Sequence, residues 1–395
     1  MIGEEPVFKG DGPLIVLIAG EPSGDVLGGR LMAALKRQQA VRFAGVGGPN
    51  MAAEGLQSLF PMAELSIMGL AEVLPHVPHL LGRIRETVAE ITRLRPAAVI
   101  TIDSPGFNFR VAKRLEGLDA PIIHYVAPTV WAWRPGRARK IATFLDHLLA
   151  LLPFEPPYFD AVHLPCTFVG HPVVESGADE GDGQAMRQRH GIGATDPLIC
   201  LLPGSRRSET SRLLPVFSDT LALLVAVRPN LRAVIAVAGD VAPDVREAIA
   251  TWPGRPVVVS DDGDKYGAFA AADVALAASG TVVLELAMAG TPTIVTYKVN
   301  ALSAWLARRI IRVPYVNLVN IVLGREAVPE LLQEDCQPDK LADAVERLLD
   351  DEFVRRQQKE ASKEALSRLG GEGGVSPSNR AARVVLDLIS DRSKA

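Results

Sequence analysis

The segment 279–292 joins two apolar runs and carries polar residues at a spacing that suits a nucleotide. Ser279, Gly280 and Thr281 form a turn where a helix is expected to begin. Unpaired N–H groups and the helix dipole make such an end attractive to an anion. Glu285 follows Thr281 by four residues, so a phosphate at the turn would leave this carboxylate near an attached ribose. The pattern favours a nucleotide site, although a helix that only packs on a sheet can begin with the same turn.

Asp103 ends the apolar run 97–102 and opens the turn before the next helix. A carboxylate at the carboxyl end of a strand can accept a proton from a nucleophilic hydroxyl. The same position also suits a residue that caps a helix or forms a turn. Composition alone slightly favours the cap, so the hypothesis of a catalytic base needs further support.

Two glycine-containing turns close the first and second predicted strands, at 19–25 and 45–48. Glycine there would let the backbone approach a ligand closely at the carboxyl end of a strand. Neither turn matches the dinucleotide fingerprint G-x-G-x-x-G. Each alone is more typical of an ordinary turn, but the two together favour the wall of a cleft.

Two cations follow strands in the second half of the chain. Arg206 lies in the loop after the first of those strands, where a guanidinium could bind a diphosphate, and Lys298 is a weaker candidate for the same task. The sequence 262–264 reads Asp-Gly-Asp, which matches the D-x-D of some metal-dependent glycosyltransferases. Turn-forming residues are expected in that loop in any case, so no metal site is predicted.

The elements that position these residues are short aliphatic runs alternating with helical stretches, which indicates parallel strands with crossover helices. Strands are predicted at about 13–19, 41–46, 97–103, 121–127, 146–152, 197–202, 232–238, 255–259, 272–277 and 292–297. The stretch 170–183 is rich in glycine and acidic residues, which is typical of a linker. The predicted fold is α/β, with two doubly wound Rossmann-like domains facing a cleft.

We therefore predict an N-terminal domain over 1–172 and a C-terminal nucleotide-binding domain over 185–350. Helices are predicted over 351–395. Their periodicity leaves open whether they cross back onto the first domain.

Composition excludes several classes of protein. With 395 residues, 48% of them hydrophobic, the chain can bury the cores of two domains and cannot be wholly disordered. A formal charge of −4 gives no electrostatic reason for a nucleic-acid partner. Three unpatterned cysteines suit a reducing cytoplasm. No uncharged apolar run is long enough to cross a bilayer, so a spanning helix is not expected.

The segment 67–95 is unusual for an enzyme without membrane spans, because many apolar residues precede Arg83, Arg85, Arg93 and Arg95. An apolar surface edged by cations suits docking onto an anionic membrane. The pattern alone favours an ordinary amphipathic helix against the core. Two prolines, at 75 and 78, argue against one long regular helix.

Several specific motifs resemble those of the lipid-A-disaccharide synthases, a family of inverting glycosyltransferases with the two-domain GT-B fold. They are Ala-Gly-Glu-Pro-Ser-Gly-Asp at 19–25, Met-Gly-Leu-Ala-Glu-Val at 68–73, Ile-Asp-Ser-Pro-Gly-Phe-Asn from 102, His-Tyr-Val-Ala-Pro-Thr-Val-Trp-Ala-Trp-Arg at 124–134, Leu-Pro-Phe-Glu at 152–155, Gly-His-Pro at 170–172, Leu-Pro-Gly-Ser-Arg at 202–206, Ser-Gly-Thr at 279–281 with Glu285, and Asn320 before Gly-Arg-Glu at 324–326. The resemblance extends from about residue 14 to residue 340. The sequence departs from the usual family pattern at Pro22, 135–136, Asn317 and Val319, and these departures concern the shape of local loops.

The resemblance implies transfer of 2,3-diacylglucosamine from its UDP derivative to 2,3-diacylglucosamine 1-phosphate. The products would be the β-1′,6-linked lipid A disaccharide 1-phosphate and UDP. Asp103 matches the family's essential aspartate and is our candidate base for the acceptor 6-hydroxyl. Arg206 is assigned to the diphosphate, and Asn320 also matches a functional position, with its role open. The substrate-binding candidates are Ser279, Gly280, Thr281, Glu285 and Lys298 on the UDP side, and Ser23, Gly24 and Asp25 on the acceptor side.

An inverting transfer needs one base and a stabilised leaving group, so no cofactor and no metal are predicted. The expected partners are the two lipid substrates and the inner-membrane surface, with a cytoplasmic enzyme attached peripherally; a homodimer is left open. Because acylated sugars stay in the bilayer, the resemblance moves the interpretation of 67–95 towards a membrane contact. Two other functions remain as alternatives: a UDP-sugar epimerase on the same scaffold, and a non-catalytic UDP-sugar sensor.

Overall fold

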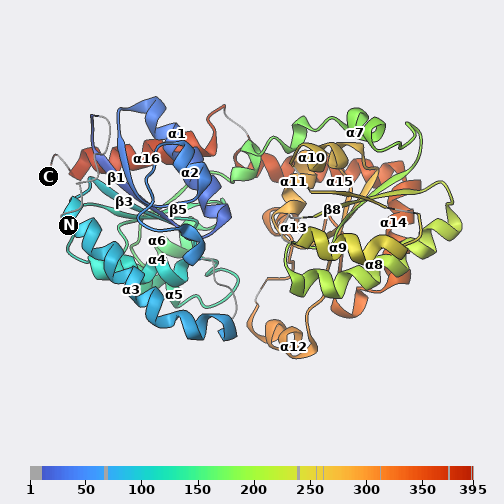
Figure 1. The fold of residues 1–395 in the computed structure, drawn as a ribbon, viewed down its shortest axis with the longest axis horizontal. Helices are drawn as coiled ribbons and strands as arrows, with labels where there is room; N and C mark the ends of the chain where they lie inside the picture. The colour runs from blue at the N-terminus through green and yellow to red at the C-terminus, as the bar shows by residue number, and fades with distance from the viewer. Residues whose placement is uncertain are drawn as a thin grey trace. The chain divides into compact units, whose positions relative to one another are not determined.

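The computed structural model describes residues 11–394, apart from 66–69, 238–240, 255, 261, 312, 372–373 and 393. The chain divides into two compact units, of which the first comprises Met1–Pro172 with Gly373–Ala395 and the second Val173–Glu372 (Figure 1). The C-terminal helices divide between them. Helix α15 (Glu352–Leu366) belongs to the second unit, whereas α16 (Pro377–Arg392) belongs to the first.

The first unit contains a parallel six-stranded sheet in the order β2-β1-β3-β4-β5-β6. Its strands are β1 (Leu14–Ala19), β2 (Arg42–Val46), β3 (Ala98–Ile102), β4 (Ile122–Tyr125), β5 (His147–Ala150) and β6 (Cys166–Phe168). Five of them lie where the aliphatic runs predict strands, and β6 is too short for such a run. Because β1 pairs with β2 on one side and β3 on the other, the order of the strands reverses there. Ligands of doubly wound sheets bind outside the carboxyl ends at such a point.

Helices cover both faces of this sheet. They are α1 (Pro22–Gln38), α2 (Pro49–Ala53), α3 (Leu70–Leu94), α4 (Pro105–Ala112), α5 (Arg137–Ile141) and α6 (Pro156–Asp160), together with α16. Alternate residues of β1 face opposite sides. Ile15 and Leu17 share a core with residues of α1 and α16, whereas Val16 and Ile18 share one with residues of α3 and α4. Burial on both faces explains why β1 is apolar throughout.

Helix α16 is fixed to the first unit by polar contacts as well as by apolar packing. Arg37 Nη2 on α1 donates to Asn379 Oδ1 at 3.2 Å. Arg380 Nε donates to the carbonyl oxygen of Val169 at 2.8 Å. The C-terminal end of the chain therefore completes the N-terminal unit.

Helix α3 continues as one helix from Leu70 to Leu94, which corrects the expectation that Pro75 and Pro78 would interrupt it. A proline inside a helix removes its own N–H from the helical ladder and crowds the carbonyl of the preceding turn, at a cost of about 3 kcal/mol. The later turns bury Ile84 and Ile91 in the core. This packing offsets the lost hydrogen bonds.

The second unit contains another parallel six-stranded sheet, in the order β12-β11-β10-β7-β8-β9. Its strands are β7 (Leu198–Leu202), β8 (Arg232–Ala236), β9 (Val257–Val259), β10 (Val274–Ala278), β11 (Thr293–Tyr297) and β12 (Glu330–Leu332). Its helices are α7 (Gly183–Arg189), α8 (Arg207–Val227), α9 (Ala242–Ala248), α10 (Asp262–Ala271), α11 (Val282–Met288), α12 (Ala301–Ile310), α13 (Leu318–Leu323) and α14 (Pro338–Asp350), with α15. Here the order of the strands reverses between β7 and β10, which are neighbours in the sheet.

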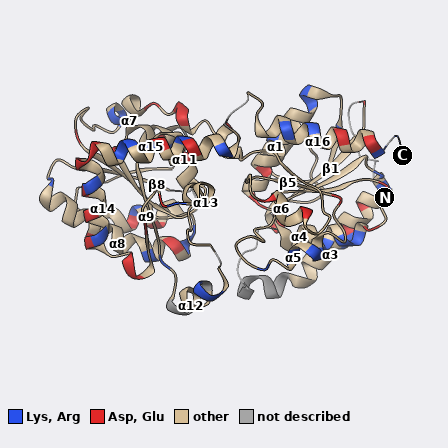
Figure 2. Ribbon diagram, turned by 180° about the vertical axis from the view of Figure 1, so that it is seen from behind, with Lys and Arg blue, Asp and Glu red and all other residues tan. Residues whose placement is uncertain are grey.

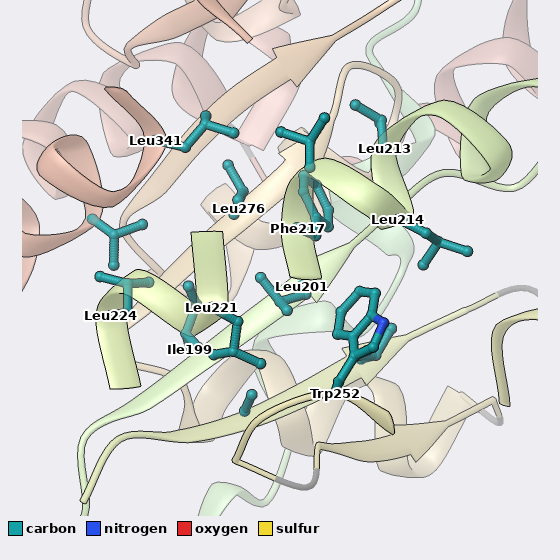
Figure 3. Close-up of a cluster of buried hydrophobic side chains, with 14 of the residues drawn as sticks. Ile199, Leu201, Leu213, Leu214, Phe217, Leu221, Leu224, Trp252, Leu276 and Leu341 are labelled. Atoms are coloured by element: carbon teal, nitrogen blue, oxygen red, sulfur yellow. The ribbon is translucent and has the colours of Figure 1, made fainter. Parts of the chain in front are cut away.

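Helix α8 packs on this sheet through an apolar face. Leu213, Phe217 and Leu221 lie in a core cluster with Ile199 and Leu201 of β7 (Figure 3). By length and composition alone α8 is apolar enough to cross a membrane, which no other helix in the described part of the chain is. One such helix is weak evidence for a span, since a core helix passes the same test.

Candidate active site

A cavity of ≈ 500 Å³ lies in the second unit, at the carboxyl ends of β7 and β10. This is the point where the strand order reverses, the usual ligand position of such sheets. The residues that line it come mainly from the loops after β7 and β10 and from the start of α11; they are Leu202, Gly204, Ser205, Arg206, Glu209, Ala236, Val237, Ser260, Lys265, Ala278, Ser279, Gly280, Thr281, Val282 and Glu285. Five residues singled out in the sequence therefore share one cavity: Arg206, Ser279, Gly280, Thr281 and Glu285.

Arg206 is oriented by Glu209, which lies on the first turn of α8. Arg206 Nη1 donates to Glu209 Oε1 at 3.2 Å, and the Ser205 N–H donates to Oε2 at 3.1 Å. The Tyr297 hydroxyl donates to the same carboxylate at 3.1 Å. Glu209 is buried, whereas the Arg206 side chain is 59% exposed. The carboxylate thus steadies a guanidinium that remains accessible from the cavity.

Two neighbours show that this carboxylate is built into the loop. Gly204 has φ +106°, and a Cβ atom there would lie 2.5 Å from Glu209 Oε2, so only glycine fits. Burial, reinforced by the Glu209 carboxylate, raises the pKa of Tyr297. The Tyr297 hydroxyl therefore stays protonated and continues to donate its hydrogen bond to Glu209.

Glu285 is paired inside the cavity. Lys265 Nζ lies 3.1 Å from Glu285 Oε2 and 3.2 Å from Oε1. The Tyr266 hydroxyl donates to Oε1 at 3.3 Å. Both partners come from α10, and Lys265 also lines the cavity. A ligand hydroxyl that binds Glu285 must therefore share this carboxylate with Lys265 and Tyr266.

Asn320 lies outside the cavity and is fully buried on α13. Its Nδ2 donates to the Val328 carbonyl oxygen at 2.8 Å and to Glu330 Oε1 at 3.1 Å. Its Oδ1 accepts from the N–H groups of Ala327 and Val328 at 2.8 and 2.9 Å. The amide is thus satisfied within the protein and does not face a ligand in this conformation.

The Asn320 network nevertheless reaches the cavity. Glu330 Oε1 also accepts from the Val316 N–H at 3.1 Å, and the Val316 carbonyl oxygen accepts from Ser279 Oγ at 3.2 Å. Asn320 is therefore connected to a cavity-lining serine through two residues. Lys298, by contrast, follows β11 and is not among the residues that line the cavity.

In the first unit, Asp103 and Ser104 form a left-handed turn between β3 and α4, with φ of 46° and 42°. Positive φ is uncommon outside glycine and costs on the order of 1–3 kcal/mol per residue. Asn108 stabilises the turn, since its Nδ2 donates to the carbonyl oxygens of Asp103 and Ile102 at 2.8 and 3.0 Å. Burial raises the pKa of the Asp103 carboxyl. A strained turn thus presents a carboxylate with increased proton affinity beside the β1–β3 switch point.

A second strained residue lies at the same edge of the sheet. Val126 follows β4 with φ 80°, which is a rare conformation for a β-branched residue. The adjacent Tyr125 carbonyl oxygen accepts from the Asp103 N–H at 2.9 Å. Strain at two neighbouring strand ends is typical of functional sites.

Glu155 secures the loop that follows Val126. It is buried after β5, and its Oε1 accepts from Trp131 Nε1 at 3.1 Å. Its Oε2 accepts from the N–H groups of Leu151 and Leu152 at 3.2 and 3.0 Å. Burial raises the pKa of Glu155 to about 7, against the lowering effect of these donors. One carboxylate therefore joins the tryptophan loop to the end of β5.

The predicted acceptor residues differ in exposure. Ser23 is exposed and Gly24 is buried at the start of α1. Asp25 is buried, and its oxygens accept from the N–H groups of Gly48, Asn50 and Met51 at 2.8, 2.9 and 3.0 Å. The Asp25 carboxylate therefore joins α1 to the start of α2 and does not face solvent.

The D-x-D motif lies only partly in the described residues, because the side chain of Asp262 lies outside them. Asp264 is paired with Arg189 and with His190, whose Nε2 lies 3.3 Å away. Sequence reasoning assigned no role to Glu209, Lys265 or Glu155. Glu209 had a detectable signal, since it follows Arg206 by three residues at the start of a helix.

Comparison with known proteins agrees with this geometry. The family model described as lipid-A-disaccharide synthetase matches residues 15–383. A lipid-A-disaccharide synthase from Rhodospirillum centenum is 58% identical over 383 residues, which cover 96% of this chain and 95% of that protein. Another, from Paramagnetospirillum magneticum, is 53% identical over 382 residues and covers 95% and 97%.

Among solved structures, S. aureus MnaA with UDP aligns with a TM-score of 0.68 at 13% identity, over 97% of each chain. The identity is too low to show more than the fold. Together with the two parallel sheets, this likeness shows a GT-B architecture of two Rossmann-like domains. The prediction that a cleft separates them stays a prediction.

Proposed function

The chain belongs to the lipid-A-disaccharide synthase family, and from that premise we propose how its residues divide the work of the reaction. The enzyme is an inverting glycosyltransferase of lipid A biosynthesis. It joins UDP-2,3-diacylglucosamine to 2,3-diacylglucosamine 1-phosphate, gives lipid A disaccharide 1-phosphate and releases UDP. The observation that carries the proposal is the shared cavity of Arg206, Ser279, Gly280, Thr281 and Glu285.

The second unit would bind the nucleotide. Arg206 carries a fixed positive charge, and charge on the diphosphate increases as the bond to the sugar breaks. Ser279, Gly280 and Thr281 would bind phosphate oxygens, while Glu285 accepts hydrogen bonds from the ribose hydroxyls. The cavity volume suits a ligand of this size.

Two further residues support this assignment. Glu209 is a positioning residue, since it orients Arg206 and is itself buried. Lys265 pairs with Glu285 and lines the same cavity, so a ribose that shares the carboxylate would lie beside its ammonium group. Lys298 lies outside the lining, which leaves it with the weakest support of the predicted cations.

Asp103 would act as the base. Its carboxylate takes the proton of the acceptor 6-hydroxyl, and the 6-oxygen attacks the anomeric carbon of the donor. The bond from that carbon to the diphosphate then breaks, and its electron pair leaves with UDP. Attack opposite the leaving group converts the α-linked donor to a β-linked product without an enzyme nucleophile.

The remaining predicted residues receive positioning roles in the proposal. Ser23 is exposed and could contact the acceptor, whereas Asp25 shapes the adjacent loop from within. Asn320 would act through Glu330 and Val316 on Ser279, and this chain of hydrogen bonds is the route that supports a role for a fully buried amide.

We also propose a cytoplasmic enzyme attached peripherally to the inner membrane, because its diacylated substrates are retained in the bilayer. Part of segment 67–95 lies outside the described residues. In the described part, Arg83 pairs with Glu64 and Glu86, and Arg93 pairs with Glu90, so these cations are partly neutralised. A homodimer stays a prediction from the resemblance.

The reaction is tested by release of UDP from the donor in detergent micelles that contain both lipids, with and without EDTA. We expect release that depends on the acceptor and is unchanged by EDTA. Epimerised nucleotide sugar formed without acceptor would instead indicate an isomerase. Saturable UDP binding without any release would indicate a sensor.

A further inference from the structure

Helix α12 in the second unit presents apolar side chains to solvent. Trp305 and Leu306 are 51% and 49% exposed, and Ile310 is exposed on the next turn. With 3.6 residues per turn, these three side chains lie about 100° or more around the helix from Ala304. Ala304 is buried, and Arg308 donates to Glu334. The apolar side of α12 therefore faces outward.

The segment that carries this apolar side is basic. Segment 298–316 contains Lys298, Arg308, Arg309 and Arg312 and no acidic residue. The Arg309 guanidinium lies over the Trp305 ring, 3.7 Å from its centroid, on the outward side of the helix. Figure 2 shows α12 with a basic band and no acidic one. Tryptophan, aliphatic residues and arginine together are typical of helices that lie in a membrane interface.

A second exposed aromatic shows what distinguishes α12. Phe353 on α15 is 56% exposed, and the Arg356 guanidinium lies 5.7 Å from its ring centroid. Phe353 directly follows the acidic residues Asp350, Asp351 and Glu352. Both helices therefore carry an exposed aromatic with an arginine, but of these two α12 alone combines it with a segment that contains no acidic residue.

The segment that carries α12 begins and ends beside the nucleotide cavity. It starts after Tyr297, whose hydroxyl donates to cavity-lining Glu209. It returns at Val316, whose carbonyl oxygen accepts from cavity-lining Ser279. Whatever binds α12 therefore acts on a segment attached to the cavity at both ends.

We propose that the outward side of α12, formed by Trp305, Leu306, Arg309 and Ile310, docks on an anionic lipid bilayer. The proposal rests on the proposed function, because a donor whose acyl chains stay in the bilayer requires the UDP cavity to reach the membrane surface. Apolar burial supplies non-selective affinity, and each arginine near an anionic surface adds about 1 kcal/mol. This surface is distinct from segment 67–95, which belongs to the first unit.

The test uses four matched variants of the full chain and co-sedimentation with vesicles of phosphatidylglycerol or phosphatidylcholine. We expect Trp305→Ser to lower the partition coefficient about tenfold on both vesicles, since apolar contact is lost. We expect Arg309→Gln to lower it about fivefold on phosphatidylglycerol only. Phe353→Ser and Arg356→Gln should match the wild type. UDP affinity, measured by calorimetry, verifies that each variant is folded.

Equal partition of Trp305→Ser and the wild type would overturn the proposal, as would equal losses for Trp305→Ser and Phe353→Ser. A change of oligomeric state in Trp305→Ser, measured by sedimentation velocity, would identify the surface as a contact between copies and would also overturn it. UDP release in detergent micelles should be unaffected by Trp305→Ser. Absence of that release in the wild type would contradict the reaction itself, independently of the vesicle result.

Discussion

The two units present their candidate functional residues in different physical ways. In the second unit, charged groups surround a cavity and are already paired, as with Arg206 and Glu209 or Lys265 and Glu285. In the first unit, Asp103 lies on a left-handed turn and burial raises its pKa. One site is organised by electrostatic pairing and the other by backbone strain. Paired charges in the second unit suit a leaving group whose charge needs stabilising. The strained turn of the first unit suits a base whose proton affinity and orientation must be fixed.

Replacing Asp103, the carboxylate on the strained turn, should give the largest effect on turnover. We expect Asp103→Asn to lower kcat about 10²–10⁴-fold, because an amide cannot accept the proton of the acceptor hydroxyl. Steady-state UDP release with both lipids measures this loss. Asp119→Asn, an exposed aspartate of the same unit, should keep wild-type turnover. Near-normal turnover in a folded Asp103→Asn variant would show that Asp103 is not the base.

The buried carboxylate of Glu155 should make the stability of the first unit depend on pH. The folded-state pKa of Glu155, about 7, lies above its ordinary value of 4.5. Below pH 4.5 the Glu155 carboxyl is protonated in both the folded and the unfolded chain, and its contribution to stability is fully present. As pH rises towards 7, the unfolded chain loses this proton first, so that contribution is lost. The loss is of the order of 3 kcal/mol at most.

Glu155→Gln removes this titration, so the decline in unfolding free energy between pH 4.5 and 7 should become shallower than in the wild type. Denaturant unfolding at a series of pH values measures it. The exposed Glu116→Gln variant should retain the wild-type slope. Equal slopes for Glu155→Gln and the wild type would show that Glu155 titrates normally.

Weakening the electrostatic pairing of the second unit should give a smaller effect. Glu209→Gln keeps the shape of the side chain but loses the charge that orients Arg206. We expect kcat/KM to fall about tenfold, because a charge-assisted hydrogen bond contributes roughly 1.5 kcal/mol more than a neutral one. The exposed Asp219→Asn on the same helix is the control. An unchanged kcat/KM would mean that Arg206 needs no such orientation.

The sequence predicted most of the sheet framework because buried parallel strands form continuous aliphatic runs. It missed β6 and β12, which have three residues each and no such run. It also failed to anticipate that α3 continues through Pro75, because the packing of distant residues outweighs a local break in the ladder.

For the candidate site, local patterns singled out Arg206 and Glu285, which share the cavity, and Asp103, whose role stays a prediction. Lys265 lines the cavity and Tyr297 contacts cavity-lining Glu209, and both come from other elements, so only the fold brings them to their partners. Asp25 illustrates the converse. Its position in a specific motif suggested a substrate contact, but its oxygens accept from the backbone of a neighbouring loop.

In the proposed function, the second unit binds UDP and the first supplies the base. Calorimetric titration of UDP into Asp103→Asn and Arg206→Ala tests it most directly. The account predicts wild-type affinity for Asp103→Asn and at least about tenfold weaker binding for Arg206→Ala, since a charged contact to the diphosphate is lost. Equal weakening in the two variants, or unchanged affinity in Arg206→Ala, would contradict it.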